Sequence, residues 1–318
     1  MIRLAIVSPC YNEEAVLEQS AAKIETVMKD LMAKKKITDN SFVLYVNDGS
    51  QDATWDIITR LYKQGTTFRG INLAHNVGHQ NALMAGMMTA RTMADAVITM
   101  DCDLQDDVNA IEKMIDKHSG GEADIVFGVK VSRDADTKKK RYSAELYYKM
   151  LQAMGVKTIY NHADFRLLSR QVLDTLALYP ERNLYLRGLI ANLGFKTSTV
   201  DDVIQPRLAG ESKYTLQKMA RLATDGITSF STRPIEMIIT AGAVMMLIAL
   251  CMFIYVIISI CMQHYTAGWA SLMMSLWFIG SVVTIAIGIV GIYIGKIYIE
   301  VKRRPLYTIA EKLTDEKE

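Results

Sequence analysis

The sequence is poor in several residue types, and each shortage excludes a class of protein. Its 318 residues include only 4 cysteines, too few for a disulfide-stapled fold, and their spacing matches no zinc site. Lysine and arginine number 36 against 34 acidic residues, so the basic excess typical of nucleic-acid-binding domains is missing. Because 50% of the residues are hydrophobic and 22% charged, the composition also excludes a disordered chain and predicts one or two folded domains.

Formal charge is absent altogether from one long stretch. The 59 residues from 237 to 295 contain no Asp, Glu, Lys or Arg. A membrane-spanning helix needs about 20 apolar residues, so the stretch predicts two spans, at about 237–262 and about 269–294, joined by a polar hairpin around His264. A helical hairpin buried in a large soluble core is the alternative, which the length of the uncharged run disfavours.

Basic residues next to these spans predict their orientation. The hairpin carries no Lys or Arg, whereas both outer flanks do. Positive residues stay on the cytoplasmic side, so we expect a multi-pass protein of the inner (cytoplasmic) membrane with both termini cytoplasmic. Four parts follow: a cytoplasmic domain over 1–212, interfacial amphipathic helices over 213–233, the spans within 234–295 and a cytoplasmic juxtamembrane tail over 296–318.

Small residues recur every three or four positions along the second predicted span. Such a stripe allows another helix to approach closely. Packing against the first span is the favoured interpretation, and self-association into a homo-oligomer through the second transmembrane helix is the other. The stripe consists of Gly280, Thr284, Gly288, Gly291 and Gly295.

Ahead of the spans, short apolar runs alternate with helical stretches. We expect strands at 4–8, 42–46, 70–73, 96–100 and 124–127, and helices near 14–35, 54–62, 80–94 and 107–117. This alternation is typical of an α/β fold with a mostly parallel sheet. No G-x-G-x-x-G follows the first strand and no G-x-x-x-x-G-K-[ST] occurs, which argues against a dinucleotide-binding Rossmann site and a P-loop.

Polar clusters follow four of the predicted strands. Ligands of open α/β sheets bind off the carboxyl ends of the strands, so we expect the four clusters to form one site. They are Tyr11-Asn12-Glu13-Glu14, Asn47-Asp48-Gly49-Ser50, His75-Asn76-Val77-Gly78-His79-Gln80 and Asp101-Cys102-Asp103-Leu104-Gln105-Asp106.

Asp101 and Asp103 are the most informative pair in these clusters. Residues i and i+2 of a strand point to the same side, so the two carboxylates should lie side by side and repel one another, while Cys102 should point the other way. Mg²⁺ or Mn²⁺ would relieve their repulsion while also binding substrate phosphates. His75 and His79 are four residues apart, but Gly78 argues against a helix between them, so a substrate-facing loop is favoured over a metal pair.

Taken together, the motifs resemble those of family 2 glycosyltransferases of the polyprenyl-phosphate type, the group of dolichyl-phosphate mannose synthase and bactoprenol glucosyltransferase. The resemblance covers almost the whole chain. It departs at Cys102, where the family usually has Ala, and at Asp107-Val108, where it often has two prolines. The further matching stretches are Ala163-Asp164-Phe165-Arg166-Leu167-Leu168, Glu181-Arg182, Arg187-Gly188, Gly210-Glu211-Ser212-Lys213-Tyr214 and Arg304-Pro305-Leu306-Tyr307.

The resemblance implies a GT-A fold over residues 1–212 and inverting sugar transfer from a nucleotide-sugar donor to a polyprenyl phosphate in cell-envelope glycan synthesis. UDP-glucose is favoured, with N-acetylglucosamine, mannose or a modified pentose as alternatives. Asp48 would hold the nucleobase, and Asp101, Asp103 and Gln105 would bind the metal. The other residues implied in nucleotide-sugar binding are Pro9, Tyr11, Asn12, Glu13, Asn76, Gly78, His79 and Gln80.

The same resemblance implies catalytic and acceptor-binding residues. Asp101, Asp103, Asp164 and Arg166 would be catalytic, with an orienting role for Asp164 favoured over that of a base. Arg133, Arg141 and Ser143 would bind the acceptor phosphate, although a basic run such as 138–141 is also typical of a solvated surface.

Two rival functions stay open at this point. The first is a processive polysaccharide synthase of the same superfamily. Such synthases resemble one another in carrying a Q-x-x-R-W element and more membrane spans, whereas this chain has no Arg-Trp pair and two predicted spans. A non-enzymatic nucleotide-sugar binder or transport subunit has no use for four polar strand ends, and the spans lack the charged residues of a transport pathway.

Overall fold

The fold was analysed in a computed structural model that describes residues 1–103, 105–130, 162–203, 233–261 and 268–314. Eight strands form one sheet in the order β7-β5-β6-β4-β1-β2-β3-β8. In chain order they are β1 (Leu4–Cys10), β2 (Phe42–Asn47), β3 (Phe68–Leu73), β4 (Ala96–Thr99), β5 (Ile125–Lys130), β6 (His162–Ser169), β7 (Thr197–Asp202) and β8 (Ile309–Leu313). The pairs β1–β2, β1–β4, β2–β3 and β5–β7 are parallel, and the other three are antiparallel.

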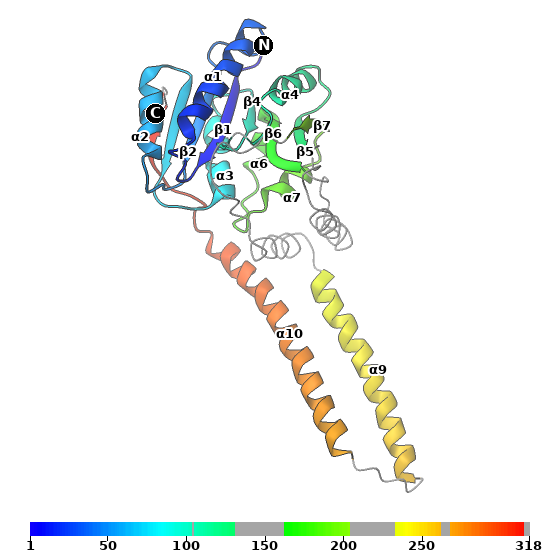
Figure 1. Cartoon of the computed structure of the whole chain (residues 1–318). Helices are drawn as coiled ribbons and strands as arrows, with labels where there is room; N and C mark the ends of the chain where they lie inside the picture. Colours follow the sequence, from blue (N-terminus) through cyan, green and yellow to red (C-terminus); the bar gives the residue numbers. More distant parts are fainter. Residues whose placement is uncertain (104, 131–161, 204–232, 262–267, 315–318) are drawn as a thin grey trace.

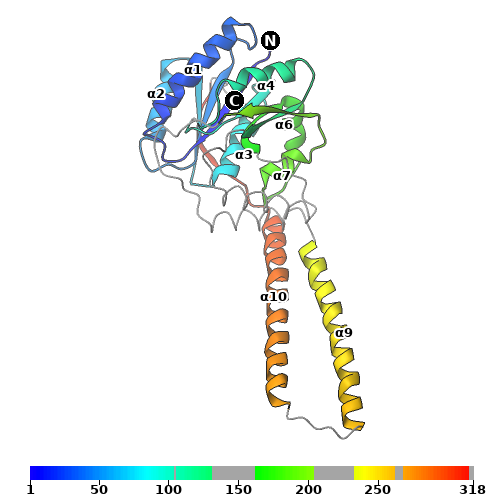
Figure 2. The ribbon, with the colours of Figure 1, turned by 45° about the vertical axis from the view of Figure 1, so that its right-hand side comes forward.

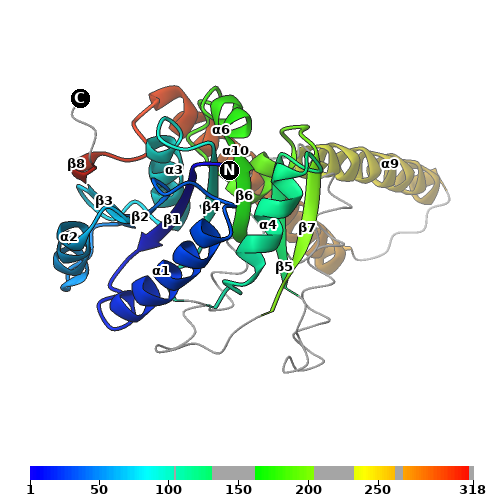
Figure 3. The ribbon, with the colours of Figure 1, turned by 90° about the horizontal axis from the view of Figure 1, so that it is seen from above.

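Helices cover both faces of this sheet (Figures 1 and 3). Helices α1, α2 and α4 contribute to the core on one face, and α3, α6 and α7 to the core on the other. The described helices are α1 (Leu17–Ala33), α2 (Thr54–Gln64), α3 (His79–Ala90), α4 (Ala110–Ser119), α6 (Arg170–Leu176), α7 (Leu186–Ala191), α9 (Arg233–Cys261) and α10 (Trp269–Lys302). The mostly parallel α/β sheet predicted from the alternation is confirmed.

Strand β1 shows why the sequences of the central strands are continuously apolar: both faces of the sheet are buried. Leu4 and Ile6 enter one core while Ala5 and Val7 enter the other, and all four are fully buried. Each large apolar side chain buried in this way stabilises the fold by about 1.5–3 kcal/mol. Helix α3 lies so close to β1 that a Cβ on Gly86 would come within 2.3 Å of Val7 Cγ1, so only glycine fits there.

Helices α9 and α10 project together from the α/β domain (Figure 2). Among the described residues, one segment, Phe278–Lys302, is long and apolar enough to cross a membrane, with a mean hydropathy of 2.2. Helix α10 begins at the predicted residue but continues to Lys302, eight residues past the predicted end at 294.

The glycine stripe of α10 is not packed as favoured. A Cβ placed on Gly280, Gly288, Gly291 or Gly295 would meet no atom within 4 Å. None of the described side chains of α9 therefore packs on these glycines. Self-association through it stays a prediction.

The tail after α10 returns to the sheet, which the sequence analysis did not predict. Arg303 adopts a left-handed conformation (φ 46°) and ends α10. Leu306 and Tyr307 then pack against the core, and β8 pairs antiparallel with β3. Trp55 Nε1 donates to Glu311 Oε2 at 3.2 Å. Residues 309–313 of the expected juxtamembrane tail thus complete one edge of the α/β domain.

Candidate active site

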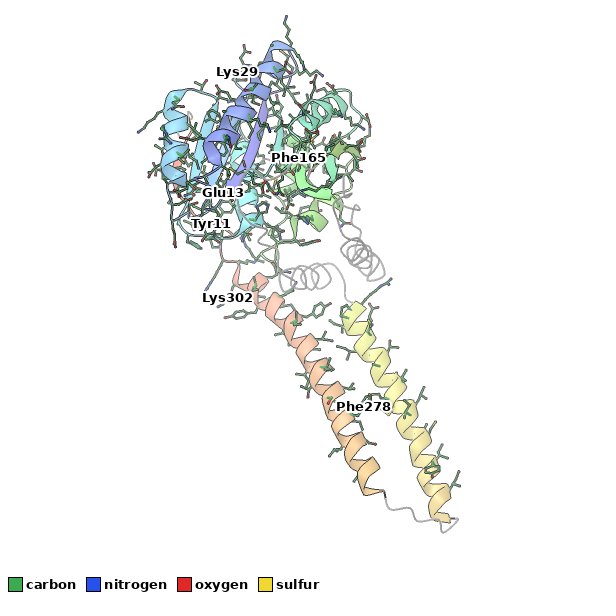
Figure 4. The ribbon with its side chains drawn as sticks, in the orientation of Figure 1. Tyr11, Glu13, Lys29, Phe165, Phe278 and Lys302 are labelled. Carbon is green, nitrogen blue, oxygen red and sulfur yellow. The ribbon has the colours of Figure 1, made fainter. Side chains whose placement is uncertain are left out.

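Every predicted polar cluster lies beyond the carboxyl end of its strand. Strands β1, β2, β3 and β4 are joined by parallel pairing, so their carboxyl ends share one edge of the sheet. Strand β6 runs antiparallel to β4, and its first residues therefore reach the same edge. Figure 4 shows Tyr11 and Glu13 on the side of the domain that faces Lys302 at the end of α10, with Lys29 on the far side.

The first two clusters hold each other in place. Asn12 donates its backbone N–H to Ser50 Oγ at 3.0 Å, and its Oδ1 accepts from Gln51 N at 2.9 Å. Asn12 has a φ of 55°, in the left-handed region that asparagine tolerates better than most residues. Glu13 N donates to Thr54 Oγ1 at 3.0 Å. These bonds fix the loop around Tyr11, a residue that stays 40% exposed, while Pro9 lies within β1.

The Asp48 carboxylate accepts hydrogen bonds from two backbone amides of the loop after β3. Its Oδ1 accepts from Val77 N at 2.7 Å and its Oδ2 from Gly78 N at 3.0 Å. Asn76 Nδ2 returns a hydrogen bond to the Asp48 carbonyl at 3.1 Å. Burial raises the pKa of the Asp48 carboxyl, although the two backbone amides oppose that rise. With only 3% of the residue exposed, Asp48 ties the loop after β3 to the end of β2.

The third cluster turns directly into α3. Gly78 has a φ of 87° and precedes His79, the first residue of the helix, so the predicted non-helical link between His75 and His79 is confirmed. Gln80 accepts from Leu186 N at 2.8 Å through its Oε1, and its expected part in nucleotide-sugar binding stays a prediction. That bond ties the start of α7 to the start of α3.

Five charged side chains meet where α3, β6, α7 and the turn after β4 converge. Arg187 makes a bidentate contact with Asp164: Nε donates to Oδ1 at 3.2 Å and Nη2 donates to Oδ2 at 2.9 Å. His79 Nε2 lies 3.5 Å from Asp164 Oδ2 and 3.6 Å from Asp101 Oδ1. On the buried side, Arg166 Nη2 donates to Asp164 Oδ1 at 3.0 Å.

The opposite charges within this cluster shift the pKa values of Asp164 and His79. Burial would raise the pKa of Asp164, but Arg187, His79 and Arg166 outweigh it and hold the pKa well below its usual range. Partial burial would lower the pKa of His79, but Asp164 and Asp101 raise it to about 9. At neutral pH the cluster therefore contains a carboxylate at Asp164 and a cation at His79, which remains 43% exposed.

Arg166 does not face the open site. The residue is fully buried in the middle of β6, and within the described part of the chain its Nε and Nη1 have no hydrogen-bond partner. Its one hydrogen bond to an acidic side chain in that part goes to Asp164. In this position Arg166 supports Asp164 from the buried side, and its predicted catalytic role stays a prediction.

The predicted metal ligands lie in a turn and not on a strand. Strand β4 ends at Thr99, so the i, i+2 argument does not apply to Asp101 and Asp103, although Cys102 is buried as expected. Asp103 Oδ1 accepts from Gln105 N at 3.2 Å, which closes the turn. Asp106, buried beneath, accepts from Asp101 N at 3.2 Å.

This turn nevertheless suits a hard divalent cation. Asp101 keeps 46% of its side chain exposed and, with Asp103 and Gln105, offers only oxygen ligands. Within the described residues no group of three His, Cys, Asp or Glu side chains forms a ready metal site. A cation held by one or two carboxylates and completed by substrate phosphates needs no such group.

Other expected site residues have different outcomes. Arg133, Arg141 and Ser143 lie outside the described residues. Arg187 was quoted as part of a family motif but not assigned to the site, and the structure brings it onto Asp164. The Arg187-Gly188 match was the available signal for it.

Comparisons with known proteins show which family this sequence matches. Residues 5–177 match the family model described as glycosyl transferase family 2. The chain is 44% identical to the uncharacterized glycosyltransferase YkoT of Bacillus subtilis (strain 168), covering 98% of this chain and 93% of the relative. It is 37% identical to the SfII prophage-derived bactoprenol glucosyl transferase of Shigella flexneri, covering 97% of each. It is 36% identical to a prophage bactoprenol glucosyl transferase homolog of Escherichia coli (strain K12), covering 97% of this chain and 98% of the relative.

Proposed function

We propose that this chain, which belongs to glycosyl transferase family 2 and is a glycosyltransferase, moves a sugar from a nucleotide-sugar donor to a polyprenyl phosphate such as undecaprenyl phosphate. A UDP-sugar is the favoured donor and glucose the favoured sugar. The observation that carries the proposal is the Asp101–His79–Asp164–Arg187 cluster, on the edge of a GT-A-like sheet that faces α10. Relatives named bactoprenol glucosyl transferases over nearly the full length support the choice of acceptor.

The acceptor explains why a cluster without a strong base is sufficient. A phosphate monoester has a second pKa near 6, so at neutral pH its oxygen is already an anionic nucleophile. Asp164, with its pKa held far below neutrality, is a poor proton acceptor and serves to orient Arg187 and His79. Direct attack on the anomeric carbon would displace the nucleoside diphosphate and invert the configuration.

Charge neutralisation is the main task of this chain in that reaction. His79 is a cation next to Asp101, and together with Arg187 it places positive charge at the site where two anions must meet. A divalent cation bound at Asp101, Asp103 and Gln105 would supply the charge that stabilises the departing diphosphate. Arg133, Arg141 and Ser143 are proposed to hold the acceptor phosphate.

The proposed membrane arrangement supports the choice of a lipid acceptor. We propose that α9 and α10 are the two spans of an inner-membrane protein, with the catalytic domain over 1–212 and both termini in the cytoplasm. The segment expected to form interfacial helices, 213–233, lies outside the described residues except for Arg233, the first residue of α9. The face bearing Tyr11 and Glu13 then lies toward the bilayer (Figure 4). A lipid phosphate at the headgroup level could meet a donor bound at that face.

Purified full-length protein tests the proposal. It should transfer sugar from one member of a panel of UDP-sugars and GDP-mannose to undecaprenyl phosphate in detergent, with Mg²⁺ or Mn²⁺ present. Asp103→Asn is the matched control, because it removes a partly exposed carboxylate outside both cores and should keep the fold. Lipid-independent turnover of the donor, or full activity in Asp103→Asn, would contradict the proposal.

A further inference from the structure

The end of α10 is joined to the α/β domain through one acidic side chain. Glu300 accepts from Arg182 N at 2.9 Å (Oε1) and 3.0 Å (Oε2), and from Asn183 N at 2.6 Å (Oε1). It is the only Asp or Glu between Glu236 and Glu311. Hydrogen bonds to an ionised acceptor are about twice as strong as neutral ones, so this contact is a firm joint between the membrane helix and the loop before α7.

The surroundings of the joint show that its geometry is specific. Burial raises the pKa of Glu181, and the negative charge of Glu300 acts in the same direction. Placing like charges in a half-buried position is unfavourable unless their oxygens are hydrogen-bonded. The paired amides of Arg182 and Asn183 provide that compensation for Glu300.

The loop held by Glu300 leads straight into the active site. Three residues after Asn183, Leu186 N donates to Gln80 Oε1 at the start of α3. The next residue, Arg187, makes the two-nitrogen contact with Asp164. Figures 1 and 2 place α7 on the side of the domain from which α10 leaves. A stretch of six residues is thus fixed by the membrane helix at one end and by Asp164 at the other.

We propose that Glu300 is a positioning residue for sugar transfer: by fixing the 182–183 backbone it holds Arg187 on Asp164, so that the seating of α10 sets the geometry of the active site. This inference rests on the proposed function for the reaction it affects. It makes α10 a structural part of the catalytic unit and not merely an anchor. The tail docking through β8 holds the same end of the helix against the sheet.

A double-mutant cycle tests whether Glu300 acts through Arg187. Residues that share one hydrogen-bonded segment are energetically coupled, so Glu300→Ala should lower kcat about 10-fold with little change in the KM for the nucleotide sugar. In an Arg187→Lys background the same change should cost less than about 2-fold, because the positioning is already lost. Glu300→Gln keeps one acceptor oxygen and should recover part of the activity. Effects of Glu300→Ala and Arg187→Lys that multiply fully would overturn the proposal.

The matched control is Glu311→Gln. It neutralises another tail carboxylate, which accepts a hydrogen bond from Trp55 Nε1 and, within the described residues, makes no hydrogen bond to the loop before α7. It should leave kcat within about 2-fold, whereas a loss equal to that of Glu300→Ala would mean that tail docking in general is being measured.

Hydrogen–deuterium exchange on the full-length protein gives a readout that needs no substrate. Glu300→Ala should expose the amides of Arg182 and Asn183 to faster exchange, and Glu311→Gln should not. Unchanged protection in Glu300→Ala would overturn the joint whatever the activities are. An inactive wild type with the joint intact would instead count against the proposed function.

Discussion

Asp48 and Asp164 are two carboxylates at the same edge of the sheet with opposite electrostatics. Both are largely shielded from water, with 3% of Asp48 and 13% of the Asp164 side chain exposed. Burial raises the pKa of Asp48, and its two backbone amides do not cancel the effect. Burial acts in the same direction on Asp164, yet Arg187, His79 and Arg166 drive its pKa far down.

The difference separates a carboxylate held by backbone amides from one held by cations, and nucleobase binding by Asp48 stays a prediction. Backbone dipoles hold Asp48 as a tie between two loops, and a tie of this kind does not depend on a full negative charge. Asp164 is surrounded by cations that must themselves be placed, and its charge organises them. Substitutions that remove charge but keep shape should therefore affect the two sites differently.

Asp164→Asn should have the largest effect. Removing the charge leaves buried Arg166 without its ionic partner, which typically costs about 3–5 kcal/mol. Arg187 also loses its anchor, and misplacing an active-site group by about 1 Å costs about 100-fold in rate. Steady-state kinetics from pH 6 to 9 should show that loss at every pH. Recovery at high pH would indicate that Asp164 acts as a base after all.

The comparison also predicts opposite pH dependences of stability. The folded-state pKa of Asp164 is depressed, so its contribution is present above the unfolded value of about 3.9 and is lost as pH falls through the folded pKa. The destabilisation caused by Asp164→Asn, measured by urea unfolding, should therefore shrink toward acid pH. Destabilisation that stays constant down to the acid limit of folding would contradict the low pKa.

His79→Gln should have the next largest effect, about 10-fold on kcat, because it removes a cation that two carboxylates share. With a folded pKa raised to about 9, the stabilisation from His79 is fully present below its unfolded value of about 6.5 and is lost as pH rises through about 9. Wild-type activity should fall along that alkaline limb, and His79→Gln should lack it. An identical limb in both proteins would assign it to another group.

A strand could be predicted from the sequence only where its own residues form a recognisable hydrophobic pattern. The central strands were visible because they are buried on both faces, as Phe42–Asn47 is over its whole length. Strand β6 was missed because Asp164 and Arg166 interrupt its apolar pattern. Strand β8, Ile309–Leu313, is a polar edge strand whose partner β3 lies more than 230 residues away in the sequence, so no local pattern predicts it.

The site residues likewise divide into those that a local sequence pattern predicts and those that only tertiary packing brings to the site. Asp101, Asp103 and Asp48 follow apolar strands directly, so strand-end reasoning found them. Arg187 sits on a six-residue helix that reaches Asp164 only through tertiary packing. Gln80 and Asp48 were found, but their hydrogen bonds to Leu186, Val77 and Gly78 depend on loop geometry that spacing alone does not reveal.

Asp48→Asn should have a smaller effect than Asp164→Asn and the opposite pH slope. An Asn side chain has one acceptor oxygen, so either Val77 N or Gly78 N would face an NH₂ group, at a cost of about 1–3 kcal/mol. Because the folded pKa of Asp48 is raised, its contribution is greatest at low pH and is lost as pH rises through that pKa. Urea unfolding should show more destabilisation at pH 4 than at pH 7. The reverse order would mean that Asp48, like Asp164, depends on its charge.

Glu112→Gln should have the smallest effect, and it tests whether a low pKa alone marks a functional carboxylate. Hydrogen bonds from Lys36 and Lys34 lower the pKa of Glu112 to about 2, a shift in the same direction as that of Asp164. The Glu112 side chain is 34% exposed on α4, however, and water and salt screen ion pairs at such positions. We expect kcat to stay unchanged and the melting temperature to move little, and raising the salt concentration should reduce even that difference. A loss of activity would show that the far side of the sheet communicates with the site, and pairing strength could then no longer separate Asp164 from surface carboxylates.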